Sequence, residues 1–327
     1  MEEISFSLVM LAYNHEKYIA QAIESILCQK TDVNYEIIIG EDASQDNTRE
    51  IVRKYQLLYP NIIKPVYNKY NIGATKNLYH LIGKANGKYI AFIDGDDYWC
   101  VEDRIEKDIV FLENHKEYIG ISHQCKMVDR EGSELGNNTD KKTICNLPDG
   151  SIFTLDDFKK WKMPGHFSCQ TIRNFFPNID YRIIYQASDI IGDRTIAMLT
   201  ALQGNVYRDS KVVSCYRYCN SKDDNNFTSQ FANRNWRDKE VFTMTRIEKW
   251  LNKKRNVYID LGEMKKNLLA ASVTVWMKNL TRNNLQVILR IVRYSGAPLR
   301  YFYYVIKTII LKLFYWYILK EDIRIKL

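Results

Sequence analysis

Apolar and polar positions alternate in blocks over the first 100 residues. Four short apolar runs are typical of strands buried in a parallel sheet, and they lie at residues 6–12, 35–40, 63–67 and 88–93. The segments between them carry apolar residues at helical spacing, and they lie at residues 16–29, 48–58 and 73–85. This alternation of strand and helix predicts an α/β fold, a mostly parallel sheet with helices on both faces.

Polar side chains follow three of the predicted strands, where ligands of such sheets bind. They are Tyr13 and Asn14 after the first strand, Glu41 and Asp42 after the second, and Asp94, Asp96 and Asp97 after the fourth. Neither a dinucleotide fingerprint nor a phosphate-binding loop with its lysine follows the first strand. The polar residues at these strand ends therefore do not bind a ligand through either of these two motifs.

The strongest chemical signal is the acidic segment Asp94-Gly95-Asp96-Asp97. Three carboxylates within four residues repel one another unless they are solvated or neutralised by a cation. Oxygen ligands suit Mg²⁺ or Mn²⁺, whose remaining ligands are usually water and substrate phosphates. The segment is thus compatible with a metal–diphosphate site. A solvated turn explains the same four residues equally well, since this composition is also turn chemistry.

Basic residues concentrate at the C-terminal end of the chain. Residues 241–327 hold 17 Lys and Arg against 5 Asp and Glu, whereas the whole chain has a net charge of +8. Such asymmetry indicates a polyanionic partner for this end, either nucleic acid or an anionic membrane. Nucleic acid is disfavoured because the basic residues are interleaved with bulky aliphatic ones.

Residues 299–319 predict a helix of unusual pattern. Arg300, Lys307, Thr308 and Lys312 share one arc, and the rest of the surface is aromatic or aliphatic. A helix lying in the membrane interface suits this pattern, because it keeps the lysines among the headgroups. Packing on the protein's own core or on a sister chain is the alternative, and a spanning helix is disfavoured by its two central lysines.

Composition bounds the remaining possibilities. A chain of 327 residues with 46% apolar and 26% charged residues is globular rather than disordered, and no long uncharged apolar run indicates a polytopic membrane protein. The first residues lack the pattern of a signal peptide, and the seven cysteines are irregularly spaced, so we expect a cytoplasmic protein with reduced thiols. We predict two domains, residues 1–225 and a helical C-terminal region at 226–327.

The chain resembles the family 2 glycosyltransferases, which have the GT-A fold. The resemblance is clear over residues 5–120 and weaker to about residue 220. Four blocks carry it in the same order: Ser7-Leu8-Val9-Met10-Leu11-Ala12-Tyr13-Asn14, Tyr35 to Thr48 with Glu41-Asp42-Ala43-Ser44, Asn71-Ile72-Gly73, and Gly87 to Trp99 with Asp94-Gly95-Asp96-Asp97. The usual D-D-G-S is Glu41-Asp42-Ala43-Ser44 here, a departure that keeps Asp42.

The resemblance implies a donor site for a nucleoside diphosphate sugar. Contacts to the nucleotide are implied for Ala12, Tyr13, Asn14, Asp42 and Asn77, with Asp94 toward the ribose. Asp96 is implied as the metal ligand, with Asp97 as a less certain second contributor. The implied cofactor is Mn²⁺ or Mg²⁺.

The acceptor side is implied by two later segments. His166, within residues 164–173, and Trp99 are expected on the acceptor or diphosphate side, although a lone histidine is often a structural hydrogen-bonding residue. Gly192-Asp193 matches the position of the catalytic base in inverting members. Asp189 is a rival for that role, and an aspartate at a helix start is also an ordinary cap. Tyr216-Arg217 matches a strand end that we expect to be structural.

These assignments imply an inverting transferase that moves a sugar, most simply from a UDP-sugar, to a hydroxyl of a glycan or lipid-linked glycan. The common role of this family and the basic C-terminal end of the chain favour a part in bacterial capsule, O-antigen or exopolysaccharide assembly at the inner face of the cell membrane. Helices expected at 237–252 and 263–280 could cover the acceptor cleft or form a homodimer. The main alternative is a non-catalytic scaffold that recruits a partner to the membrane, and the intact Asp42, Asp94, Asp96 and Asp193 argue against it.

Overall fold

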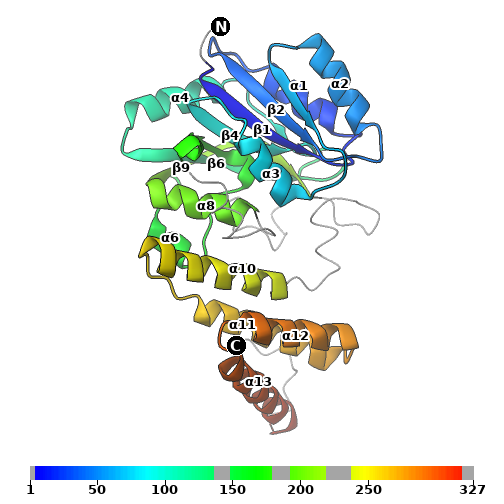
Figure 1. Ribbon diagram of the computed structural model, residues 1–327, viewed down its shortest axis with the longest axis vertical. Helices are drawn as coiled ribbons and strands as arrows, with labels where there is room; N and C mark the ends of the chain where they lie inside the picture. The colour runs from blue at the N-terminus through cyan, green and yellow to red at the C-terminus, as the bar shows by residue number, and fades with distance from the viewer. Residues whose placement is uncertain (1–3, 136–147, 179–191, 219–236, 319–327) are drawn as a thin grey trace. The chain divides into compact units, whose positions relative to one another are not determined.

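The computed structural model describes residues 4–135, 148–178, 192–218 and 237–318 (Figure 1). The chain divides into two compact units, which are described separately. The first comprises Met1–Tyr185 and Gly192–Cys219, and the second comprises Gln186–Ile191 and Asn220–Leu327. The domain boundary predicted between residues 225 and 226 lies outside the described residues.

Four parallel strands form one half of the sheet in the first unit. They are β1 (Phe6–Ala12), β2 (Tyr35–Glu41), β3 (Ile63–Tyr67) and β4 (Tyr89–Asp94), in the order β3-β2-β1-β4. The register pairs Ala12 with Glu41 and Leu11 with Asp94. The carboxyl ends of β1, β2 and β4 therefore meet at one edge, as the strand and helix pattern predicts.

The other half of the sheet is mixed, and the apolar pattern did not predict it. β8 (Gln170–Arg173) is antiparallel to β4, and β6 (Tyr118–Val128) is antiparallel to β8. β9 (Asn205–Arg217) runs parallel to β6, while β5 (Tyr98–Trp99) and β7 (Ile152–Phe153) pair antiparallel with β9. This half brings residues 98–99, 118–128, 170–173 and 205–217 into one sheet.

Helices cover both faces of the sheet, as predicted (Figure 1). Apolar side chains of α1 (Ile19–Leu27), α2 (Thr48–Leu58) and α4 (Arg104–Asn114) form one core with Phe6, Leu8 and Met10 of β1. On the other face, α3 (Ala74–Ile82) packs so closely on β2 that a side chain larger than hydrogen at Gly40 would overlap Leu81. α8 (Gly192–Gln203) packs against α3 in turn. Shorter helical segments complete this unit: α6 (Leu155–Lys159), η1 (Phe167–Cys169) and η2 (Phe176–Asn178).

The second unit is helical, which confirms the predicted C-terminal extension. Its elements are α10 (Arg237–Trp250), the π-helical turn η3 (Leu251–Arg255), α11 (Gly262–Lys278), α12 (Arg282–Tyr294) and α13 (Pro298–Ile318). Val241, Leu269, Val287 and Ile291 form the centre of its core. The buried Lys265 ammonium donates to Glu248 Oε2 (2.6 Å) and to the Ser295 carbonyl (3.2 Å), so this cation is paired within the unit.

α13 has two apolar faces. Tyr301, Tyr304, Val305 and Ile309 pack into the core of the second unit. A second stripe is exposed, and it comprises Leu299, Phe302, Tyr303, Ile306, Ile310, Leu313 and Phe314. Lys312 is only 7% exposed, so the predicted polar arc is wrong at this position, because the helix turns it toward its own unit. Among the described helices, none is long and apolar enough to cross a membrane.

Candidate active site

The loops after β1 and β2 are fastened to each other by hydrogen bonds. Asn14 has a left-handed backbone (φ 56°), and its N–H donates to Ser44 Oγ (3.0 Å). The Gln45 N–H donates to Asn14 Oδ1 (2.8 Å), and the Asp42 N–H donates to the Ala12 carbonyl (2.9 Å). The predicted nucleotide-binding residues Ala12 and Asn14 thus shape this edge, beside a half-buried Tyr13.

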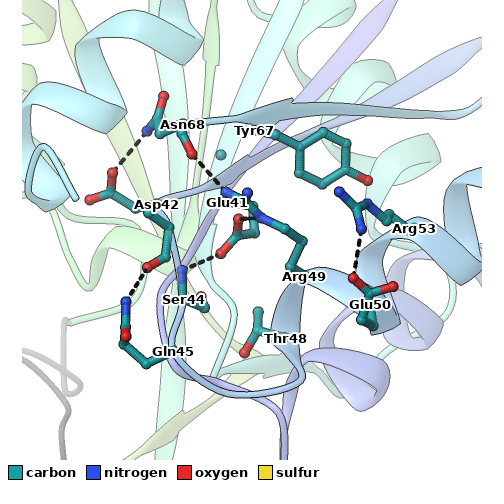
Figure 2. A network of polar contacts seen from close by, with 12 residues as sticks. Glu41, Asp42, Ser44, Gln45, Thr48, Arg49, Glu50, Arg53, Tyr67 and Asn68 are labelled. Carbon is teal, nitrogen blue, oxygen red and sulfur yellow. Dashed lines mark hydrogen bonds and ion pairs between the residues drawn. The ribbon is translucent and has the colours of Figure 1, made fainter. Parts of the chain in front are cut away.

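Asp42 is held by a third loop, after β3. Its Oδ1 accepts from Asn68 Nδ2 (2.8 Å) and from the Ile72 N–H (2.9 Å), and its Oδ2 accepts from the Gly73 N–H (2.9 Å). The side chain is 3% exposed, and Figure 2 shows it pointing toward Asn68. Asp42 therefore fixes residues 71–73, a positioning role that the sequence did not reveal.

Glu41 is anchored on the opposite side of the same strand end. Its buried carboxylate forms an ion pair with Arg49 Nε of α2 and accepts from the Ser44 N–H (2.7 Å). Arg49 Nη2 also donates to the Asn68 carbonyl (2.7 Å), and its guanidinium stacks over Tyr67 (Figure 2). The longer side chain at position 41, a departure from the family pattern, is thus used to reach α2.

Asn77 lies below this edge rather than in it. It is 1% exposed, its Nδ2 donates to the Gly40 carbonyl (2.8 Å), and its Oδ1 accepts from Asn68 Nδ2 (3.2 Å). Asn68 therefore bridges Asn77 and Asp42. The structure places Asn77 as a support for the loop, since both ends of its amide are already bonded.

The acidic segment forms a tight turn at the end of β4. The Asp97 N–H donates to the Asp94 carbonyl (3.0 Å), and the Gly95 N–H donates to the Leu11 carbonyl of β1 (2.7 Å). His15, which the sequence did not single out, has its Nε2 3.9 Å from Asp96 Oδ1. The turn therefore presents Asp94, Asp96 and Asp97 beside the loop after β1.

Electrostatics link this turn to α8. Burial and then the charges of Asp96 and Asp193 raise the pKa of Asp94 to about 8. Burial, Asp96 and Asp94 likewise raise the pKa of Asp97, although the Arg217 N–H donates to its Oδ1 (2.9 Å). Asp97 Oδ2 is buried and has no hydrogen-bond partner among the described residues. The site therefore concentrates negative charge, and the nearby Arg217 guanidinium donates to backbone carbonyls and to Gln21 rather than to these carboxylates.

This donor set fits a hard divalent cation. Carboxylate oxygens are the ligands that Mg²⁺ and Mn²⁺ prefer, and a bound cation would relieve the repulsion that raises the pKa of Asp94 and Asp97. Asp96 and the unpaired Asp97 Oδ2 are the oxygens available for it.

Asp193 is exposed in the first turn of α8, where the helix dipole favours a negative charge. Its neighbour Gly192 packs on α3, and a β-carbon there would lie 2.9 Å from Leu78 Cδ2. This close approach places the start of α8 on α3, and Asp193 lies near enough to Asp94, almost 100 positions earlier in the chain, for its charge to raise the pKa of that carboxyl. The rival Asp189 lies outside the described residues.

Arg217, at the end of β9, clamps the acidic turn. Its Nε donates to the Asp96 carbonyl (2.9 Å), its Nη1 donates to the carbonyls of Asp129 (3.0 Å) and Arg130 (2.6 Å), and its Nη2 donates to Gln21 Oε1 (2.8 Å). The sequence indicated only a structural strand end here. The arginine instead joins α1, the acidic turn and the end of β6.

The two residues predicted on the acceptor side lie in different places. His166 precedes η1, is half-buried, and packs against Tyr216 with the rings tilted and their centroids 4.3 Å apart. Trp99 is 3% exposed and packs edge-on against Phe6, at the opposite end of β1 from the acidic turn. The prediction for Trp99 is therefore wrong, because pairing of β5 with β9 turns its ring into the core.

A buried ionic cluster supports the mixed half of the sheet and was not predicted. His123 Nε2 lies 2.7 Å from Asp108 Oδ1, and His123 Nδ1 lies 3.1 Å from Asp209 Oδ2. Burial disfavours the charged imidazole, but the two carboxylates more than offset this and raise the pKa of His123 to about 9. Thr171 Oγ1 also donates to Asp108 Oδ2 (2.6 Å), which joins α4, β6, β8 and β9.

The fold and the site together define an α/β protein with a carboxylate-rich, cation-compatible edge at the ends of β1, β2 and β4. The sequence model of the family described as glycosyl transferase family 2 matches residues 7–182. The chain therefore belongs to this family, which confirms the resemblance seen in its motifs.

Several relatives are similar to part of the chain. A dTDP-rhamnosyl transferase of Shigella flexneri, RfbG, is 44% identical over 105 residues, which cover 31% of this chain and 35% of that protein. An Escherichia coli UDP-Glc:α-D-GlcNAc-diphosphoundecaprenol β-1,3-glucosyltransferase, WfaP, is 38% identical over 117 residues, covering 36% of this chain and 45% of that protein. The chain thus matches less than half the length of these curated relatives, and the same holds for other relatives such as a Mycobacterium tuberculosis protein at 37%.

A structural likeness covers more of the chain than these sequence matches do. The crystal structure of residues 1–349 of Staphylococcus aureus TarS in complex with UDP superposes with a TM-score of 0.53 and 17% identity. The match covers 99% of this chain and 94% of that one. At this identity the likeness shows the fold alone.

Proposed function

We propose that the protein is an inverting glycosyltransferase that uses a nucleoside diphosphate sugar and transfers its sugar to a hydroxyl of a glycan or lipid-linked glycan. The observation that carries this proposal is that Asp96 and Asp193 both lie near enough to Asp94 for their charges to raise its pKa, although these residues come from the end of β4 and the start of α8. A single displacement requires one group that stabilises the negative charge on the leaving diphosphate and another that accepts the proton of the acceptor hydroxyl.

Asp96, with Asp97 beside it, is the proposed holder of Mn²⁺ or Mg²⁺. Such a cation supplies charge neutralisation for a diphosphate leaving group. Asp94 begins the same turn, and we propose that it contacts the ribose. Arg217 keeps the turn in place by binding the Asp96 carbonyl, and His15 flanks it.

Asp193 is proposed as the base. It accepts the proton of the acceptor hydroxyl as that oxygen attacks the sugar carbon opposite the leaving diphosphate. Its carboxylate is exposed at the N-terminus of α8, where an acceptor hydroxyl can reach it. One displacement on that face inverts the anomeric centre.

The nucleotide is proposed to lie on the loops after β1 and β2. Tyr13 and Asn14 offer the surface for the base, and Asp42 acts there chiefly by fixing residues 71–73. A UDP-sugar is the proposed donor. The relatives include a UDP-Glc-dependent glucosyltransferase and a dTDP-rhamnosyl transferase, and a structural neighbour was solved with UDP.

The acceptor is proposed to be a glycan of a bacterial surface polysaccharide, presented at the cytoplasmic face of the membrane. The exposed stripe of α13 supports this placement, because Arg300 and Lys307 are exposed beside it and long basic side chains can reach anionic headgroups from there. The stripe offers apolar and aromatic side chains to the interface. Association of two copies through the helical unit stays a prediction.

The test is release of nucleoside diphosphate from a panel of UDP-, dTDP- and GDP-sugars by the purified full chain. We expect turnover of one donor with Mn²⁺ or Mg²⁺, its loss with a chelator, and its recovery when the metal is restored. Asp96→Asn should reduce the turnover that depends on added metal. Asp156 is an exposed aspartate in the first turn of α6, and Asp156→Asn should leave turnover unchanged. No turnover and no thermal stabilisation by any donor would favour the non-catalytic scaffold instead.

A further inference from the structure

Two cysteines and a histidine converge beside η1, outside the carboxylate site. One ligand atom of each of Cys125, His166 and Cys169 lies within 4.8 Å of the others. Cys125 comes from β6, while His166 and Cys169 flank a single turn, in which the Cys169 N–H donates to the His166 carbonyl (3.0 Å). A ligand pair separated by two residues on one turn, completed by a ligand from a distant strand, is a common arrangement around zinc.

The fold brings these residues together through strand pairing. Ser122 of β6 pairs with Gln170 of β8, so the strands diverge at the point where Cys125 and Cys169 face each other. The turn itself is fixed on two sides. Arg104 Nη1 donates to the Ser168 carbonyl (2.7 Å), and Ser214 Oγ donates to Ser168 Oγ (2.9 Å). The three ligands therefore stand on supported backbone, as a preformed site requires.

The surroundings suit a soft or borderline cation better than a hard one. Cys125 and Cys169 are buried against Met127 and Val213. Two thiolates and one neutral imidazole cancel the charge of Zn²⁺, so the complex is neutral in this apolar setting. Ser168 fixes the orientation of the His166 ring, because its Oγ lies 2.7 Å from His166 Nδ1 and its N–H donates to the same nitrogen (3.3 Å). His166 is half-buried, which leaves a route for the ion.

We infer that Cys125, His166 and Cys169 form a binding site for Zn²⁺, with water in the fourth position. Zinc–sulfur and zinc–nitrogen bonds place tetrahedral ligand atoms about 3.5–3.8 Å apart. A contraction of about 1 Å from the observed arrangement, within reach of small side-chain rotations, closes the site. Binding displaces two thiol protons to solvent. The cation ties residues 166–169 to β6, independently of the metal that the proposed transferase activity uses.

The test is titration of the reduced, metal-free full chain with Co²⁺ under anaerobic conditions. We expect a near-ultraviolet thiolate-to-cobalt band that saturates at one equivalent and is abolished by Zn²⁺. Cys125→Ser and Cys169→Ser should each weaken the band, and His166→Gln should keep a thiolate band with altered visible absorption.

Two controls separate this site from other metal binding. Cys28→Ser, which removes an exposed thiol on another part of the first unit, should keep the band. Asp96→Asn should keep it as well, because carboxylates give no thiolate band. A folded, reduced wild-type chain with no band at one equivalent, or a band that survives both cysteine substitutions, would overturn the inference.

Discussion

Arg217→Met tests how the acidic turn is held in place. The substitution keeps much of the aliphatic stem but removes every donor, so four acceptors on Asp96, Asp129, Arg130 and Gln21 lose their partner. A buried acceptor left without a donor costs about 1–3 kcal/mol. At the low end of that range, because water reaches some of the carbonyls, the first unit loses about 4 kcal/mol.

Urea unfolding of the full chain measures this loss. With a slope of about 2 kcal/mol per molar, the midpoint of the first unit should fall by about 2 M. The matched control is Arg53→Met, which removes an exposed guanidinium that pairs with Glu50 and lies over the Tyr67 ring, and it should cost less than about 1 kcal/mol. Equal midpoints for the two variants would refute the view that Arg217 organises the turn.

Three further predictions concern other parts of the chain. Asp42→Asn should lower the melting temperature even without nucleotide, because one amide oxygen cannot serve three donors, at a cost of about 1–3 kcal/mol; an unchanged melting temperature would contradict the positioning role. His123 has a pKa of about 9 in the folded protein against an ordinary 6.5, so its stabilisation is complete below pH 6.5 and about 3 kcal/mol of it is lost as pH rises through 9. Urea unfolding between these pH values should show that loss in the wild type and not in His123→Gln, and equal slopes would rule the histidine out. Ile310→Asp, at the centre of the exposed stripe of α13, should reduce cosedimentation with anionic vesicles at least tenfold, whereas Leu57→Asp on α2 should not; equal binding by both would exclude the stripe as the membrane contact.

The N-terminal half of the fold was predictable because its signals are local. Buried parallel strands appear as continuous apolar runs, and the helices between them carry their own stripes. The ends of parallel strands share one edge by geometry, so Asp42 and Asp94 could be placed near each other from the sequence. The placing of Asp193 at this edge came from the family resemblance and not from a local signal, and its role there stays a prediction.

The mixed half was not predictable because each feature depends on a distant partner. Trp99 enters the core only through pairing of β5 with β9, more than 100 residues later. The role of His123 depends on Asp108 of α4 and Asp209 of β9, which lie far from it in the sequence. The role of Arg217 likewise depends on the acidic turn, about 120 residues earlier. Lys312 shows the same limit on a helix, since the arc of α13 that faces its own unit depends on where α11 and α12 pack.

The substitution Asp193→Asn tests the central claim most directly, once a donor has been identified. Nucleoside diphosphate release and binding of the same nucleotide with Mn²⁺ should be measured on the wild type and the variant. A base in the transition state predicts that kcat falls about 10²–10⁴-fold while the nucleotide Kd changes less than about threefold. Turnover that survives the substitution, or a loss of nucleotide binding as large as the loss of turnover, would contradict the assignment.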